Sequence, residues 1–339
     1  MSAPALALDG VSRRFVKPLD LAERAANLLG AGRRAQVVRA VDGVSLDVAP
    51  GEVLGLVGES GCGKSTLARI ASGIMEPSEG AVRIEGANRA GLGREARRRA
   101  DLAVQMVFQD PMGSLNPRMR AGDIIGEAPL VHGIVGRGEL ADYVAGQMRL
   151  VGLDPALRDR YPHQFSGGQR ARIGIARALA VKPTILVCDE ATAALDVSIQ
   201  AQVLNLFAEL RRSLGLTLLF VSHDLGVVEH ISDRVAVMYL GRIVEEATTD
   251  ALFARPNHPY TQALLAEVPR LEARKRRFSA LKGELPSPLA PPPGCHFHPR
   301  CPHAFDRCRI ERPALREVAP GQRAACHLND EATRSSSRA

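Results

Sequence analysis

The stretch that decides the fold is a glycine-rich loop, which reads Gly58-Glu59-Ser60-Gly61-Cys62-Gly63-Lys64-Ser65-Thr66. It fits the pattern G-x-x-x-x-G-K-[ST] of a phosphate-binding loop in full. The mostly apolar residues 52–57 before it predict a buried strand, and residues 66–70 after it predict the start of a helix. Glycines let backbone N–H groups turn toward phosphates, and the helix N-terminus adds its own amides and dipole. Every residue of this loop is therefore predicted to bind nucleotide.

Side chains in and beyond the loop predict magnesium-dependent hydrolysis of that nucleotide. Lys64 is expected to contact the β- and γ-phosphates, and the Ser65 hydroxyl to ligate magnesium. A second apolar strand, residues 184–188, ends in Asp189 and Glu190. Two adjacent carboxylates at a strand end suit a magnesium nucleotide site when a phosphate loop lies upstream. Asp189 would hold the metal through water, and Glu190 would act as general base on the attacking water.

Further motifs make the chain resemble the nucleotide-binding subunit of an ABC transporter over most of its length. The signature loop of that family is similar to Ser166-Gly167-Gly168-Gln169-Arg170, although Phe165 stands where leucine is commoner. Gln109 matches the family's glutamine loop, Asp196 the loop that crosses the dimer interface, and His223 the switch histidine. One departure is Ala193, where many relatives have serine. It bears on communication between sites and does not by itself threaten hydrolysis.

The resemblance implies a role for each of these residues. Gln109 would sense the γ-phosphate region, contact magnesium and face membrane subunits, while His223 would assist hydrolysis. Residues Ser166 to Gln169 would cap the nucleotide held by a second subunit. The loop itself agrees with this role, because its serine and glycines precede a periodic segment and so form a helix N-terminus that suits an anion. Phe15 would either stack on adenine, as the family's N-terminal aromatic does, or lie in the core.

The order of segments predicts an α/β fold. Residues 4–50 alternate apolar and polar in places, as in a small antiparallel layer, and a basic stretch at 17–39 interrupts them. Residues 51–110 and 171–247 alternate strands with helices, which indicates a parallel sheet covered on both faces. Residues 111–170 are expected to form an inserted helical subdomain.

Together with these segments, the resemblance implies an ABC-type P-loop nucleotide-binding domain with a RecA-like parallel-sheet core, an antiparallel β subdomain and a helical subdomain. We predict that this domain spans residues 1–250. A C-terminal extension with a four-cysteine motif would span residues 251–339, and its last residues are expected to be disordered.

Composition excludes several classes of protein. Hydrophobic residues make up 45% of the chain, and no stretch of 18 residues is free of charges, so no membrane span is expected. Residues 1–10 lack the basic start of a secretion signal, which predicts a cytosolic protein. The net charge is +7, but basic runs such as 94–99 and 270–277 are scattered, aromatics are few and tryptophan is absent. We therefore expect solvated faces and no nucleic-acid partner.

Two stretches narrow the resemblance to the ATPases of oligopeptide and dipeptide importers. These are residues 109–119 after the glutamine loop and residues 258–264 beyond the core. Residues 194–202 look more like the second of the two ATPases that such importers usually pair, which implies a heterodimer. The pair would lie at the cytoplasmic face of a bacterial inner membrane, under two permease subunits fed by an extracytoplasmic substrate-binding protein. Closure of the ATP-bound dimer would then drive import.

Other functions stay open at this point. Related importers carry nickel chelates, opines or oligosaccharides. A soluble ABC ATPase acting on ribosomes or DNA is a second class, although such proteins usually carry two nucleotide domains or a long coiled-coil insertion, and this chain has neither. A third class is a mainly regulatory subunit, against which intact Lys64 and Glu190 argue.

The tail carries a cluster of thiols, Cys295, Cys301, Cys308 and Cys326, spaced C-x5-C, C-x6-C and C-x17-C. Reduced cytosolic thiols favour a metal over disulfides. The spacing lacks the close C-x2-C pairs of ordinary zinc knuckles, whereas a [4Fe–4S] cluster accepts looser arrangements. A cluster, zinc and no metal are the alternatives, in that order. Cys62 and Cys188, which flank the nucleotide site, are interpreted as packing residues.

Overall fold

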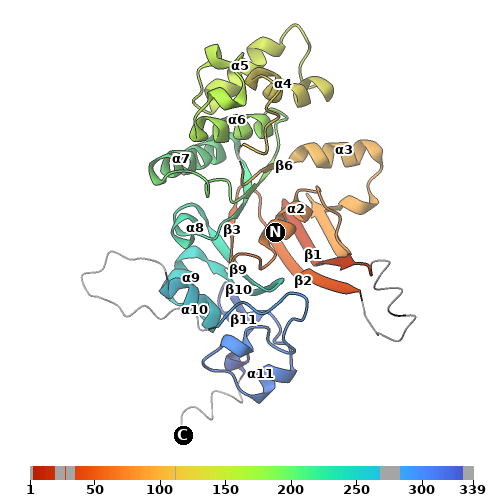
Figure 1. Cartoon of the computed structure of the whole chain (residues 1–339), viewed down its shortest axis with the longest axis vertical. Helices are drawn as coiled ribbons and strands as arrows, with labels where there is room; N and C mark the ends of the chain where they lie inside the picture. The colour runs from red at the N-terminus through yellow and green to blue at the C-terminus, as the bar shows by residue number, and fades with distance from the viewer. Residues whose placement is uncertain (1–2, 20–26, 28–34, 111, 268–282, 331–339) are drawn as a thin grey trace, which may run out of the picture.

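The computed structural model describes residues 3–19, 27, 35–110, 112–267 and 283–330 (Figure 1). The whole basic run at 270–277 lies outside these ranges, as does much of the basic stretch at 17–39. The prediction that the last residues are disordered also falls outside them. The predicted division of the chain at residue 250 stays a prediction. In the described part, no helix is long and apolar enough to cross a membrane.

An eight-stranded sheet forms the centre of the molecule, in the order β11-β12-β10-β9-β3-β8-β7-β6. Its parallel part consists of β3 (Val53–Val57), β6 (Val104–Val107), β7 (Ile185–Asp189), β8 (Thr217–Val221) and β9 (Arg234–Tyr239). Every residue of β3, β7 and β8 is buried. Such continuous apolar strands are typical of a parallel sheet covered on both faces, as predicted.

One edge of this sheet is antiparallel and includes strands from the end of the chain. The edge consists of β10 (Arg242–Thr248), β12 (Gln322–Ala324) and β11 (Arg316–Ala319). The last two strands come from the predicted extension, and the sequence analysis did not foresee them. The C-terminal segment is therefore joined to the core by main-chain hydrogen bonds.

A second, antiparallel sheet lies beside the first, in the order β2-β1-β4-β5. Its strands are β1 (Leu6–Lys17), β2 (Gln36–Val48), β4 (Glu79–Ile84) and β5 (Ala87–Asn88). The antiparallel layer predicted for residues 4–50 is present. The assignment of all strands in 51–110 to the parallel sheet was wrong, because β4 pairs antiparallel with β1. The end of β4 alternates buried and exposed residues, as expected of a strand with one solvated face.

Helices cover the central sheet and form a layer at one end of it, at the top of Figure 1. The helices along the sheet are α2 (Lys64–Ala71), α3 (Arg94–Ala103), α7 (Val197–Leu214), α8 (Leu225–Ile231), α9 (Thr249–Ala254) and α10 (Pro259–Ala266). The end layer contains α4 (Ala121–Val131), α5 (Leu140–Leu150) and α6 (Gly167–Leu179), and α11 (Asp306–Ile310) lies in the C-terminal segment. The described residues also form short 3-10 turns, which are η1 (Arg89–Gly91), η2 (Pro155–Leu157), η3 (Pro162–Gln164), η4 (His298–Arg300) and η5 (His327–Asn329).

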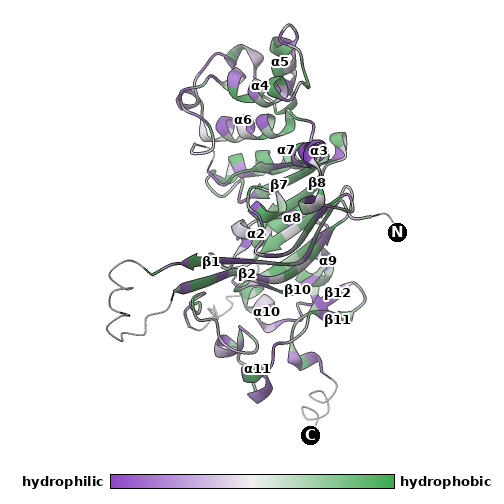
Figure 2. Cartoon of the chain, turned by 90° about the vertical axis from the view of Figure 1, so that its right-hand side faces the viewer, coloured by the Kyte–Doolittle hydropathy of each residue, from purple (hydrophilic) through white to green (hydrophobic). Residues whose placement is uncertain are grey.

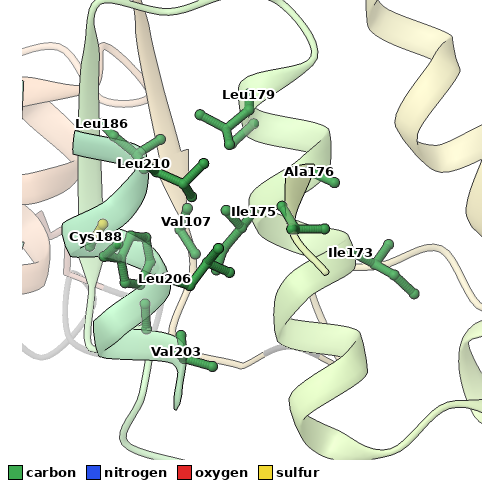
Figure 3. Close-up of a cluster of buried hydrophobic side chains, with 14 of the residues drawn as sticks. Val107, Ile173, Ile175, Ala176, Leu179, Leu186, Cys188, Val203, Leu206 and Leu210 are labelled. Atoms are coloured by element: carbon green, nitrogen blue, oxygen red, sulfur yellow. The ribbon is translucent and has the colours of Figure 1, made fainter. Parts of the chain in front are cut away.

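The apolar core links the helical layer to the sheet. Leu186 of β7, Ile175 of α6 and Leu206 of α7 are buried in one cluster, shown as sticks in Figure 3. Phe207 packs edge-on against Phe220 of β8, with ring centroids 5.9 Å apart. In Figure 2 the strands of the central sheet are mainly hydrophobic, whereas the helices carry both hydrophilic and hydrophobic residues. Burial of this kind of surface is the main favourable term in folding and holds the strand ends in place.

Candidate active site

The predicted phosphate loop connects the end of β3 to the start of α2. Gly63 is the residue before the helix and has a φ of 112°, a backbone angle that residues with side chains rarely adopt. A Cβ at this position would overlap the carbonyl oxygen of Ala40 in β2. The glycine therefore serves two needs, a left-handed backbone and close contact with the antiparallel sheet.

The Lys64 side chain is buried at the centre of the loop. Its ammonium donates hydrogen bonds to the carbonyl oxygens of Gly58 at 2.8 Å and Glu59 at 3.1 Å. It lies 4.0 Å from the nearest carboxylate oxygen of Glu190. A buried cation whose described partners are two carbonyls and one carboxylate is a strong attractor for phosphate oxygens.

Ser65 and Asp189 meet beside the loop, although they are far apart in the sequence. The Ser65 hydroxyl donates to Oδ1 of Asp189 at 2.9 Å. Burial raises the pKa of the Asp189 carboxyl, and the neighbouring Glu190 charge adds to that effect. A hydroxyl and a carboxylate are hard oxygen donors of the kind that magnesium prefers, so these two residues fit the predicted metal.

Glu190 is the point on which the predicted catalytic side chains converge. Gln109 donates from Nε2 to its Oε2 at 2.8 Å, and Nδ1 of His223 lies 3.2 Å from the same oxygen. The Glu190 backbone has a φ of 49°, an uncommon value for a residue with a side chain, and its N–H donates to Val221 in β8. Uncommon backbone angles of this kind cluster at functional sites, because the surrounding structure must enforce them.

A cavity of about 230 Å³ lies over the phosphate loop. It is lined by Val38, Arg39, Ala40, Ser60, Gly61, Cys62, Gly63, Lys64, Ser65, Thr66, Gln109, Glu190, Leu240, Gly241 and Pro288. Sequence analysis missed the β2 residues and Pro288. Nothing local in the sequence marks them, because the chain folds them in from distant segments.

Phe15 lies next to this cavity without lining it. Its neighbour across the strands is Val38, which does line the cavity. The Phe15 ring is 38% exposed, and the Arg13 guanidinium lies 5.1 Å from its centroid. Phe15 is therefore outside the core, and adenine stacking stays a prediction.

The signature residues lie outside the described lining of the phosphate cavity. The Ser166 hydroxyl accepts the N–H of Gln169 at 3.3 Å, and the Gln169 side chain accepts the N–H of Ser166 at 3.1 Å, which caps α6. A Cβ on Gly168 would lie 2.5 Å from Ile199 in α7, so this glycine allows the two helices to approach. Gly167 and the α7 cap Asp196 are exposed. The loop is thus open to solvent and available to another molecule.

The cysteines divide into a buried pair and a tail group. Cys62 and Cys188 are buried, and burial raises the pKa of both thiols, which makes them poorly reactive. In the tail, burial and the neighbouring thiols raise the pKa of Cys295 to about 11 and that of Cys326 to about 12. Across the described ranges, no group of three or more Cys, His, Asp or Glu side chains is placed to hold a metal ion. The structure therefore does not support the iron–sulfur or zinc site predicted at Cys295, Cys301, Cys308 and Cys326.

Known proteins are similar to this chain over the phosphate loop and the strands around it. Residues 41–193 match the model of the family described as ABC transporter. A probable peptide ABC transporter ATP-binding protein, y4tS of Sinorhizobium fredii, is 54% identical over 86% of this chain and 83% of its own length. This chain belongs to the ABC transporter family.

Other relatives agree with this membership. Residues 244–308 match the family described as oligopeptide/dipeptide transporter, C-terminal region. The oligopeptide transport ATP-binding protein AppF of Bacillus subtilis is 50% identical over 87% of this chain and 91% of its own length. The solved dimer of the ATP-binding cassette MJ0796 in a post-hydrolysis state, bound to ADP and Pi, aligns with a TM-score of 0.60. The two chains are 26% identical, and the alignment covers 72% of this chain and 98% of the MJ0796 chain.

Family membership carries general properties with it. The protein is an ATPase that uses ATP and magnesium and couples hydrolysis to transport. As a transporter ATPase of an importer type, it is peripheral to a membrane and works with permease subunits and a substrate-binding protein. The predicted fold class, a P-loop domain of the ABC type, is confirmed by the same comparisons.

Proposed function

We propose that this chain is an ATP-hydrolysing subunit of a peptide importer and that closure of an ATPase dimer drives transport. The names of the relatives support the peptide cargo, and the match of residues 244–308 supports the same subgroup. The observation that carries the catalytic part is the convergence of Gln109, His223 and Lys64 on the Glu190 carboxylate.

The proposed chemistry is in-line attack of water on the γ-phosphate. Glu190 would accept the proton of the water, with Gln109 and His223 holding its carboxylate in position. Lys64 would exchange its carbonyl partners for phosphate oxygens and offset their charge. Magnesium, held by Ser65 and by Asp189 through water, would supply further neutralisation of the phosphate charge.

The site is proposed to be complete only between two subunits. Ser166 and Gly167 are exposed at the N-terminus of α6, Gln169 is half-buried, and Gly168 is buried beneath them. This exposed helix N-terminus supports a role for the loop in capping the nucleotide of a partner. Asp196 would lie at the same interface. The resemblance of residues 194–202 to the second of two paired ATPases favours a paralogous partner, and thus a heterodimer at the cytoplasmic face of the membrane. Co-expression followed by native mass spectrometry distinguishes a heterodimer from a homodimer.

A charge-neutral substitution tests the assignment of the base. In the complex assembled with its permeases, Glu190→Gln is expected to bind ATP, to lose turnover by about 10²- to 10⁴-fold, and to accumulate the closed dimer. Glu229→Gln, which changes an exposed carboxylate on α8, is the matched control and keeps normal turnover. Normal steady-state turnover in the Glu190 variant would remove this residue from the role of base.

The cargo is tested with the same complex. Peptides are expected to stimulate ATP hydrolysis in the presence of the substrate-binding protein. Stimulation by a nickel chelate, an opine or an oligosaccharide instead would place the chain in a related importer. Co-purification with ribosomes or DNA in place of permeases would contradict transport altogether.

Metal binding by the tail is kept as a proposal with its own test. Its basis is the set of four thiols in the tail, Cys295, Cys301, Cys308 and Cys326, although the described side chains are not arranged as a metal site. Four thiolates are a donor set for a [4Fe–4S] cluster or for zinc. Quantification of iron, sulfide and zinc after anaerobic purification decides between them, and a metal-free folded protein would contradict both.

A further inference from the structure

The C-terminal segment, described over residues 283–330, contacts the phosphate loop at Glu59. The Nη1 atom of Arg300 lies 2.8 Å from Oε1 and 3.1 Å from Oε2 of Glu59. The Tyr260 hydroxyl accepts the N–H of the same Glu59 at 2.9 Å. Glu59 is thus held by its side chain and its main chain from residues about two hundred positions later in the sequence.

The residues that hold Glu59 are packed into the apolar core. Tyr239 at the end of β9, Tyr260 in α10 and Phe297 in the C-terminal segment are fully buried, with ring centroids 4.6 to 5.4 Å apart. Phe297 directly precedes η4, which carries Arg300. The Arg300 side chain is only 5% exposed and lies over the Tyr239 ring. Packing of this kind fixes a side chain in one position, because core side chains occupy defined rotamers.

The held residue is directly connected to the nucleotide site. The carbonyl oxygen of Glu59 is one of the two that accept hydrogen bonds from the Lys64 ammonium. The Glu59 carboxylate is a negative charge in a loop built to receive a polyanion, and Arg300 offsets that charge. Pro288, from the same C-terminal segment, also lines the cavity over the loop.

We propose that Arg300 and Tyr260 are positioning residues for nucleotide binding, through which the C-terminal segment sets the affinity of the phosphate loop for MgATP. Arg300 neutralises and orients the Glu59 side chain, and Tyr260 orients its peptide group. Neither residue is among the described residues that line the cavity over the loop, so the chemical step is not expected to depend on them. The inference rests on the proposed nucleotide site and adds a determinant of affinity to it.

The test measures binding of MgATP to the full-length chain by isothermal titration calorimetry. Arg300→Gln leaves the Glu59 charge without its partner and is expected to weaken binding by about tenfold. In the Glu59→Gln background that charge is gone, so the same Arg300 substitution is expected to change affinity by less than about twofold. A merely structural role for Arg300 would instead produce the same loss in both backgrounds.

Matched variants separate positioning from general damage. Arg307→Gln removes ion pairs with Glu311 and Asp330 in the same segment and is expected to bind MgATP like the wild type. Arg300→Lys, which keeps the charge, is expected to recover part of the affinity. In the assembled transporter, Arg300→Gln is expected to raise KM for ATP while kcat stays within about twofold. Circular dichroism and thermal melting establish that each variant is folded.

Several outcomes would overturn the inference. Unchanged affinity in folded Arg300→Gln would do so, as would an equal loss in the presence and absence of the Glu59 carboxylate. If Arg300→Gln does not fold, Tyr260→Phe tests the second contact, since it removes only the hydroxyl; unaltered MgATP affinity in that variant would then decide against the inference. Failure of the wild type to bind MgATP would contradict the proposed function instead.

Discussion

Two glycines of the phosphate loop offer a direct test of why the loop folds as it does. Gly61 and Gly63 have φ values of 80° and 112°, so alanine at either position places a side chain in a disfavoured backbone region. Their surroundings differ. A Cβ on Gly61 would meet nothing within 4 Å, whereas a Cβ on Gly63 would overlap the Ala40 carbonyl oxygen and lie 2.9 Å from Cε of Met238.

The expected costs follow from these two observations. Backbone strain at a positive φ costs about 1–3 kcal/mol for each alanine. Overlap inside a packed region adds about 1–3 kcal/mol more for Gly63→Ala alone. We therefore expect Gly63→Ala to lower the free energy of unfolding by about 1–3 kcal/mol more than Gly61→Ala does. Both are expected to weaken nucleotide binding, because both alter the loop that receives the phosphates.

The assay is urea unfolding of the full-length variants, followed by far-UV circular dichroism. A stability difference appears as a shift of the midpoint at constant slope. If the two variants lose equal stability, contact with the antiparallel sheet does not explain the glycine at position 63. A larger loss for Gly61→Ala would refute the reasoning outright.

Two further predictions concern buried polar groups outside the nucleotide cavity. Burial lowers the pKa of His258 to about 4. Since the unfolded state binds this proton near pH 6.5, the free energy of unfolding should fall by up to about 3 kcal/mol as pH drops from 6.5 to 4. His258→Asn keeps an acceptor for the Tyr260 N–H and should make the free energy of unfolding, measured by urea between pH 7 and 4.5, depend less on pH. An unchanged pH dependence would show that His258 is not the group responsible. Gln322 donates to Oε1 of buried Glu245 at 2.8 Å and to the Arg255 carbonyl at 3.0 Å. Gln322→Leu should therefore cost about 1–3 kcal/mol, and an unaltered melting temperature would show that this tie is unimportant.

Short spacings in the sequence were enough to predict the nucleotide chemistry. Gly58 to Thr66 and the pair Asp189–Glu190 each follow an apolar run, and a parallel sheet brings the carboxyl ends of its strands to one edge. Local pattern and general topology therefore placed Ser65 beside Asp189 and Lys64 beside Glu190, as the structure finds them. The resemblance added Gln109 and His223, whose partner in the structure is Glu190.

The sequence alone determined the phosphate loop and its carboxylates, because their function depends on residues that are neighbours along the chain or that follow parallel strands of one sheet. Only the tertiary structure placed β4 in the antiparallel sheet and joined β11 and β12 to the central one. Only the tertiary structure, too, brought Arg300 to Glu59 across 241 positions. Such contacts depend on how whole segments pack, and no local periodicity encodes which buried arginine meets which carboxylate.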